Sequence, residues 1–182
     1  MKNKLLKNTV YSLLALFLFS VASCDGDDDL PSGPSIVVNS FCYGPDAASS
    51  FFSVEAYNNR VVESGVNIYN TKAIIVDNGI TEVNGELTGV GILVSVDLFG
   101  NRNQNFQSGN YIIGDTELVG DVVVSYFIDY DSSLMNNTGI IIESGNVMVT
   151  PYSSGYAIEI DGIDANGDRF HGIYLGEVSE LN

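Results

Sequence analysis

Apolar residues alternate with polar or small residues along three long stretches of the chain. The apolar members of the first stretch are Val90, Ile92, Val94, Val96 and Leu98. The same two-residue period recurs over residues 122–130 and 156–161. Because successive side chains of a strand point to opposite faces, this pattern predicts half-buried antiparallel strands. No window beyond residue 23 shows a sustained helical period, so the predicted class is all-β.

Turn residues separate these stretches. Asn78-Gly79 and Asn166-Gly167 each stand between two apolar stretches, which is the pattern of a type I′ hairpin turn. Further breaks fall at residues 100–107, 132–138 and 151–155. The spacing predicts an antiparallel β-sandwich of roughly 8–10 strands, with a lipocalin-like β-barrel as the alternative.

The first 23 residues have the three-part layout of a secretory signal. Lys2, Lys4 and Lys7 are followed by the apolar residues 13–19 and by the small residues Ala22 and Ser23. The apolar run is shorter than the about 20 residues that a membrane-spanning helix needs. We therefore expect residues 1–23 to be a cleaved signal peptide.

A cysteine stands where the signal would be cut. Val21-Ala22-Ser23-Cys24 resembles the lipobox of bacterial lipoproteins, although leucine is more common than valine at the first position. The resemblance implies that Cys24 becomes the lipidated first residue of the mature protein. The chains on such a cysteine give a lasting anchor, whereas one acyl chain gives marginal binding. An ordinary secretory signal with an unrelated cysteine is the alternative.

Four aspartates follow the cysteine: Asp25, Asp27, Asp28 and Asp29. They are similar to the acidic export tag of surface lipoproteins of the Bacteroidota, which implies anchoring in the outer membrane with the protein facing the cell exterior. A solvated spacer without a sorting role is the alternative interpretation. The final stretch, residues 172–176, also resembles the mostly uncharacterised β-rich lipoproteins of that group, a resemblance that carries no activity.

Charge narrows the choice of partners. Of the seven basic residues three lie in the signal, so the mature chain has four against 23 acidic residues and a net charge of about −19. Nucleic-acid binding requires a basic surface, so a nucleic-acid partner is excluded. We expect a lipidated acidic tether over residues 24–35 and a single all-β domain over residues 36–182.

Candidate catalytic residues are sparse. Cys42 has no His or Lys near it in sequence and is expected to be a buried apolar residue. His171 is the only histidine. Counting outwards from a two-residue turn at Asn166-Gly167 places it opposite Gly162, on the core face of its strand. No nucleophile or base motif is present, and we expect no catalytic residue.

One acidic cluster suits a metal ion. Asp161, Asp164, Asn166 and Asp168 supply hard oxygen ligands around glycines, and calcium is the cation that such ligands favour. The order of an EF-hand loop is not matched, and a solvated hairpin turn uses the same residue types. Calcium is therefore kept as an alternative to a purely structural turn, and no other cofactor is expected.

The sequence thus predicts a membrane-anchored, surface-exposed lipoprotein with a non-enzymatic binding or structural β domain. Its expected partner is a glycan, a peptide or a protein. The alternatives are a β-barrel carrier of a small apolar ligand, for which the many Val, Ile, Tyr and Phe residues are suggestive, and a small extracytoplasmic hydrolase. The sequence does not indicate an oligomeric state.

Overall fold

A computed structural model describes residues 38–44, 47–50, 55–58, 62–65, 67–102 and 106–181. These residues all belong to one compact unit, Gly33–Asn182. The signal, Cys24 and the aspartates after it lie outside the described residues. Within the described part of the chain, no helix has the length and hydropathy needed to cross a bilayer.

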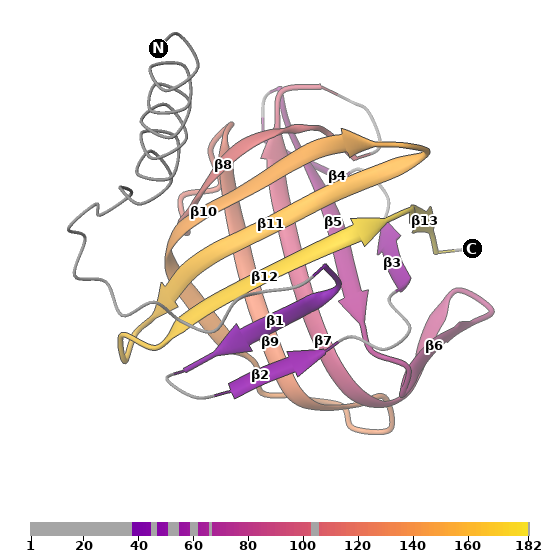
Figure 1. The fold of residues 1–182 in the computed structure, drawn as a ribbon. Helices are drawn as coiled ribbons and strands as arrows, with labels where there is room; N and C mark the ends of the chain where they lie inside the picture. Colours follow the sequence, from indigo (N-terminus) through magenta and orange to yellow (C-terminus); the bar gives the residue numbers. More distant parts are fainter. Residues whose placement is uncertain are drawn as a thin grey trace, which may run out of the picture. The chain divides into compact units, whose positions relative to one another are not determined.

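Every regular element of the described residues is a β-strand (Figure 1). In chain order the strands are β1 (Ser40–Tyr43), β2 (Ala47–Ser50), β3 (Glu55–Asn58), β4 (Val62–Gly65), β5 (Ile68–Val76), β6 (Ile80–Val83), β7 (Glu86–Gly100), β8 (Gly109–Ile113), β9 (Asp121–Asp131), β10 (Ile140–Tyr152), β11 (Gly155–Asp164), β12 (Arg169–Gly176) and β13 (Val178–Glu180). The prediction of an all-β class is confirmed.

The strands join into one curled sheet that forms a half-barrel, as the barrel alternative expects. The order along the sheet is β13-β3-β5-β7-β9-β8-β10-β11-β12-β1-β2, with β4 paired to β5 and β6 to β7. In Figure 1, β10, β11 and β12 lie in front of β5, β7 and β9 and cross them steeply. Most pairs are antiparallel, whereas β8–β9 and β13–β3 are parallel. The sheet has 13 strands, more than the sequence predicts, because the short strands carry too few residues to show a period.

Glycines and register shifts allow the long strands to bend. Gly145 has a φ of 130° and pairs with Gly162 across β10 and β11. A Cβ on Gly145 would lie 2.1 Å from the carbonyl oxygen of Asp161, so only glycine fits there. A register shift lies next to this pair, between Ile142 and Ser144, and β7 has another between Gly91 and Leu93. Irregularities of this kind increase the local twist and bend a strand.

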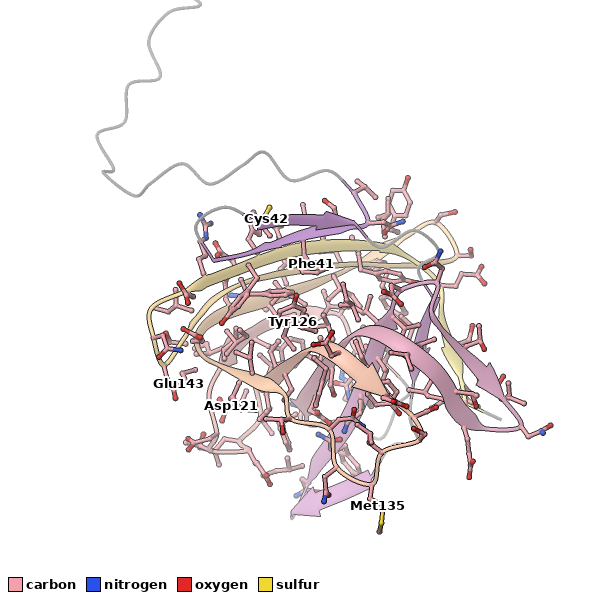
Figure 2. The ribbon with its side chains drawn as sticks, turned by 90° about the horizontal axis from the view of Figure 1, so that it is seen from below. Phe41, Cys42, Asp121, Tyr126, Met135 and Glu143 are labelled. Atoms are coloured by element: carbon pink, nitrogen blue, oxygen red, sulfur yellow. The ribbon has the colours of Figure 1, made fainter. Side chains whose placement is uncertain are left out.

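Side chains fill the concave side of the sheet. The core cluster draws on both halves of the sheet, with Val94 and Val96 from β7 and Ile158 and Ile160 from β11 at 2% exposure or less. Phe41 of β1 points toward Tyr126 of β9 with ring centroids 5.3 Å apart, whereas Cys42 lies on the other side of β1 (Figure 2). A second, smaller cluster on β5, β6 and β7 contains Ile74, Val76, Ile80 and Leu93.

The turn at Asn166-Gly167 differs from the prediction. Gly167 N–H donates to the Asp164 carbonyl and Asp164 N–H donates to the Asp168 carbonyl, so the loop has three residues. Among these loop residues only Gly167 has a positive φ, of 86°. This is a type I turn closed by a left-handed glycine and not the predicted type I′ turn.

The prediction for Asn78-Gly79 is also wrong, because β5 and β6 do not pair. Asp77 accepts hydrogen bonds there from the Gly79 and Ile92 amides at 2.9 and 3.0 Å. The type I′ hairpin lies one turn later, at Asn84-Gly85, where φ is 55° and 84° and Val83 pairs with Glu86. The hairpin thus joins β6 to β7.

Candidate functional site

An open cleft of about 670 Å³ lies at one end of the curled sheet. It forms where the end of β7, the following loop, β8, the turn before β9 and the β10–β11 turn come together. Its lining residues are 99–102, 106–111, 119–120, 151 and 153–156. The volume lies within the range of about 300–1,000 Å³ that is usual for small-molecule sites.

Aromatic residues form the buried wall of this cleft. Phe106 and Tyr111 are 7% and 5% exposed, whereas Tyr156 is half-buried. The rings of Phe106 and Tyr156 meet edge to face with centroids 5.0 Å apart. Tyr156 Oη donates a 3.2 Å hydrogen bond to the Phe106 carbonyl, and Tyr111 Oη donates a 3.1 Å bond to the Gln107 carbonyl. Two tyrosines therefore hold the segment before β8 against the sheet.

Gln107 organises the adjoining wall. Its Nε2 donates a 2.6 Å hydrogen bond to the Arg102 carbonyl. A Cβ on Gly100 would lie 2.7 Å from Gln107 Oε1, so the glycine leaves the space that this amide fills. Gly120 N–H donates a 2.8 Å bond to the Phe99 carbonyl and ties the start of β9 to the end of β7. The cleft is therefore preorganised by backbone and amide contacts.

Amides and hydroxyls dominate the remaining lining. The polar residues are Asn101, Arg102, Gln107, Ser108, Asn110, Ser153 and Ser154. Ser154 Oγ donates a 2.5 Å bond to Glu177 at the edge of the cleft. No Asp or Glu is among the described residues that line it. Glycoside hydrolysis in most families uses two carboxylates, and this lining supplies none.

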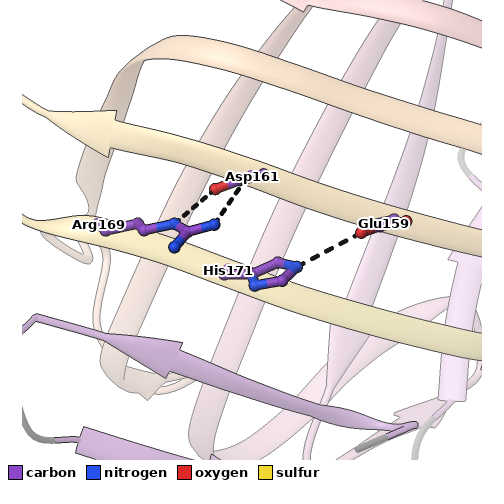
Figure 3. A network of polar contacts seen from close by, with 4 residues as sticks. All are labelled: Glu159, Asp161, Arg169 and His171. Carbon is purple, nitrogen blue, oxygen red and sulfur yellow. Dashed lines mark hydrogen bonds and ion pairs between the residues drawn. The ribbon is translucent and has the colours of Figure 1, made fainter. Parts of the chain in front are cut away.

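The candidate calcium ligands are divided between two faces of the sheet. Asp164 is 6% exposed and Asp161 is half-buried. Asp161 and Asp164 are three positions apart on β11. Because successive side chains of a strand point to opposite faces, these two carboxylates lie on opposite faces of the sheet. Asp161 accepts two 2.8 Å bonds from Arg169, whose guanidinium lowers the pKa of that carboxyl (Figure 3). Among the described residues, no group of three or more His, Cys, Asp or Glu side chains is placed to hold a metal ion.

Asp164 organises the turn between β11 and β12. Its Oδ1 accepts hydrogen bonds from the amides of Asn166 and Asp168 at 2.8 and 2.9 Å. Its Oδ2 accepts a 2.7 Å bond from the Tyr43 hydroxyl, which lowers the pKa of Asp164, and a 3.3 Å bond from Asn166 Nδ2. Both carboxylate oxygens thus have partners within the protein, as a structural turn requires.

The predicted position of His171 is wrong. The third loop residue shifts the register by one, so His171 pairs with Asp161 and Phe170 takes the place opposite Gly162. A one-residue shift moves a side chain to the other face of the sheet. His171 therefore lies outside the core, with Nε2 3.4 Å from Glu159 Oε1 (Figure 3). His171 pairs with Cys42 of the neighbouring strand β1. Cys42 is 8% exposed and is therefore buried, as expected.

Sequence reasoning did not identify the cleft, because its residues come from four separate segments. The breaks predicted at residues 100–107 and 151–155 do contribute to it, but nothing in the one-dimensional pattern indicates that they meet. Comparisons with protein-family models, with curated proteins and with solved structures found no match for the chain.

Proposed function

We propose that this chain is a lipid-anchored protein of the outer membrane that faces the cell exterior and binds carbohydrate through its β domain. The observation that carries the proposal is the preorganised cleft at residues 99–102, 106–111 and 153–156. In this account the domain binds its ligand without transforming it.

The chemistry of the lining favours a sugar over an apolar ligand. Side-chain amides and hydroxyls donate and accept hydrogen bonds, and sugar hydroxyls can pair with both kinds of group. Tyr156 adds an aromatic ring that is half-buried. A carrier of an apolar molecule requires an apolar-lined interior, whereas packed side chains occupy the concave side of this sheet. The glycan is therefore the partner that we retain.

The anchor is argued from Cys24 and the residues before it. A chain that starts with Lys2, Lys4 and Lys7, continues through an apolar run and reaches Val21-Ala22-Ser23-Cys24 fits export followed by lipidation. We expect mass spectrometry of the membrane fraction to find an acylated Cys24 at the mature amino terminus. An unmodified terminus at another residue would contradict the anchor.

Surface display is argued from the four aspartates. Protease added to intact cells should remove the domain, and replacing Asp27, Asp28 and Asp29 with alanine should protect it. Equal digestion of both versions would leave the aspartates as a spacer only. A periplasmic marker protein that stays intact shows that the outer membrane is sealed.

Sugar binding can be tested with two asparagines in matched settings. Asn110 lines the cleft, whereas Asn146 lies on the neighbouring strand β10 and is also exposed. The protein is the mature chain with Cys24→Ser, titrated by calorimetry with cellotriose, maltotriose and the trimers of galacturonate and glucuronate. Loss of one hydrogen bond weakens binding by about 0.5–1.5 kcal/mol, which is roughly two- to twelvefold in Kd.

We expect at least one of these trimers to bind, Asn110→Ala to weaken it by that factor, and Asn146→Ala to leave it unchanged. Binding of none of the sugars would contradict the proposal. Binding of palmitate in the same assay, without sugar binding, would favour the apolar carrier instead.

A further inference from the structure

Positive charge is scarce in this protein, and one cation lies in the cleft. Of the seven Lys and Arg residues, Lys72, Arg102 and Arg169 belong to the described part of the chain. Lys72 Nζ lies 3.1 Å from Asp97 Oδ1, and Arg169 Nε lies 2.8 Å from Asp161 Oδ1. Arg102 forms no ion pair with a described carboxylate. It lines the cleft and is exposed to solvent.

Acidic residues are abundant in the chain but absent from the described lining of the cleft. The chain carries 23 Asp and Glu residues, yet none is among the described residues of the cleft lining. In so acidic a protein, a ligand with a negative charge meets repulsion over most of the surface. The repulsion between exposed charges is screened beyond about 8 Å at physiological ionic strength, so the charges near the bound ligand matter most. Among the described lining residues the charged group is the guanidinium of Arg102, and the carboxylate of Glu177 lies at the edge of the cleft, where it accepts a hydrogen bond from Ser154.

The Arg102 backbone carbonyl is held by the side chain of Gln107. Gln107 Nε2 donates to the Arg102 carbonyl, and the Gln107 side chain fills the space over Gly100. Tyr111 Oη in turn holds the Gln107 carbonyl. A guanidinium whose backbone is held by such a contact loses less freedom on binding than one on an unsupported loop.

We propose that the cleft selects a sugar that bears a carboxylate, a uronate residue, and that Arg102 binds the carboxylate. This inference rests on the carbohydrate-binding function proposed above and names the class of sugar. A guanidinium presents two parallel N–H groups that match the two oxygens of a planar carboxylate. The amides and hydroxyls of Asn101, Asn110 and Ser153 then face the sugar hydroxyls.

Methyl esterification gives a matched pair of ligands, because it removes the charge and leaves the sugar otherwise intact. The probes are the trimers of galacturonate, glucuronate and mannuronate, each free and fully methyl-esterified, titrated into the mature chain with Cys24→Ser. The variants are Arg102→Gln, Arg102→Lys and Lys72→Gln. The last lowers the net charge by the same amount as Arg102→Gln while leaving the cleft unaltered.

We expect at least one free uronate trimer to bind about tenfold or more tightly than its ester, which corresponds to roughly 1.4 kcal/mol. Arg102→Gln should abolish this preference while ester binding persists. Arg102→Lys should keep part of the preference for the free trimer, and Lys72→Gln should leave this preference unchanged. Near-ultraviolet circular dichroism shows whether each variant keeps the native packing.

The possible failures are distinguishable. Equal binding of a free trimer and its ester, or a preference that survives Arg102→Gln, overturns the uronate inference and leaves the carbohydrate function standing. Tighter binding of a sulfated trimer than of any uronate would overturn the carboxylate class. Binding of none of these probes, nor of the neutral trimers, overturns the inference and the proposed function together.

Discussion

Tyr43 and Asp164 are separated by 121 positions in the chain, yet Tyr43 Oη donates a 2.7 Å hydrogen bond to Asp164 Oδ2. The bond ties the end of β1 to the turn between β11 and β12. Asp164 also binds the amides of Asn166 and Asp168, so one carboxylate organises the turn and fastens it to the neighbouring strand. Asp164, one of the candidate calcium ligands, thus has a structural role in this turn.

Removing the Tyr43 hydroxyl should destabilise the domain. Hydrogen bonds to charged groups contribute about 1.5–3 kcal/mol, and ordinary ones about 0.5–1.5 kcal/mol. Since the Tyr43 bond is only partly buried, Tyr43→Phe should lower the free energy of unfolding by about 1–2 kcal/mol in urea denaturation. Tyr152→Phe, at a tyrosine that is 52% exposed, is the matched control and should change nothing. Equal stability of the two variants would show that the bond contributes little.

The same tyrosine makes stability depend on alkaline pH. Burial, together with the bond to Asp164, raises the pKa of Tyr43 to about 12, and burial raises the pKa of Tyr126 to about 12. In the unfolded chain a tyrosine titrates near pH 10, so the unfolded state loses its protons first. The contribution of both groups is complete below about pH 10 and is lost as the pH rises through about 12.

Denaturation curves collected from pH 8 to pH 12 should therefore show stability falling steeply above about pH 10. Tyr43→Phe and Tyr126→Phe should each reduce the slope, because each removes one of the titrating phenols. Tyr152→Phe should keep it. A slope that is the same in all three variants would contradict the assignment to Tyr43 and Tyr126.

A bulky residue at Gly167 should strain the β11–β12 turn. Its φ is 86°, a conformation that β-branched residues adopt only with strain. No atom lies within 4 Å of an added Cβ, so the cost is conformational and not steric crowding by neighbours. Gly167→Val should lower stability by about 1–3 kcal/mol, and Gly167→Asn by clearly less, since asparagine tolerates this region. Thermal or urea unfolding of the two variants side by side measures the difference.

Calcium should not stabilise the domain. Both oxygens of Asp164 already accept hydrogen bonds, and Asp161 is paired with Arg169 on the other face of the strand. We expect the melting temperature of the mature chain with Cys24→Ser to be the same in calcium chloride and in EDTA. A rise of the melting temperature in calcium that Asp168→Ala abolishes would support the calcium alternative, because ligand binding to the folded state raises its stability.

The long strands could be predicted because apolar residues alternate along them, although β7 buries side chains of both faces from Leu93 to Val96. Val94, Val96 and Leu98 are buried as the alternation requires, and so are Val122, Val124 and Tyr126. Ile128 departs from the pattern at 47% exposure, near the register shift between β7 and β9. At such a shift, two residues of one strand lie opposite a single residue of its partner. This arrangement does not change the apolar pattern of the sequence, so it could not be predicted.

The hairpins show why a turn dipeptide does not determine on which face of the sheet the following residues lie. Asn78-Gly79, Asn84-Gly85 and Asn166-Gly167 have the same dipeptide, and only Asn84-Gly85 forms the type I′ turn. At Asn166 the side chain of Asp164 selects a three-residue loop by binding two loop amides. The extra residue moves His171 from the core face to the outer face, and a local dipeptide does not encode that choice.

The cleft lay beyond prediction for a different reason. Its walls join residues from β7, β8, the turn before β9 and the β10–β11 turn, which the strand pairing of the sheet brings together although they are far apart in the chain. Arg102 has no ion pair with a described carboxylate, and this depends on which carboxylates the fold brings near it, which is three-dimensional information. The charge count shows that cations are scarce, but it does not indicate which of the described cations lacks an ion pair with a described carboxylate.

Mapping the bound sugar onto the backbone amides tests the central claim most directly. An isotope-labelled mature chain with Cys24→Ser, titrated with the tightest-binding uronate trimer, should show chemical-shift changes at the amides of Asn101, Asn110 and Gly155, which line the cleft. The amides of Asn146 and Gly167, on β10 and in the β11–β12 turn, should not move. Shift changes that saturate at the cleft would support the carbohydrate-binding account, and saturating changes elsewhere with an unaltered cleft would contradict it.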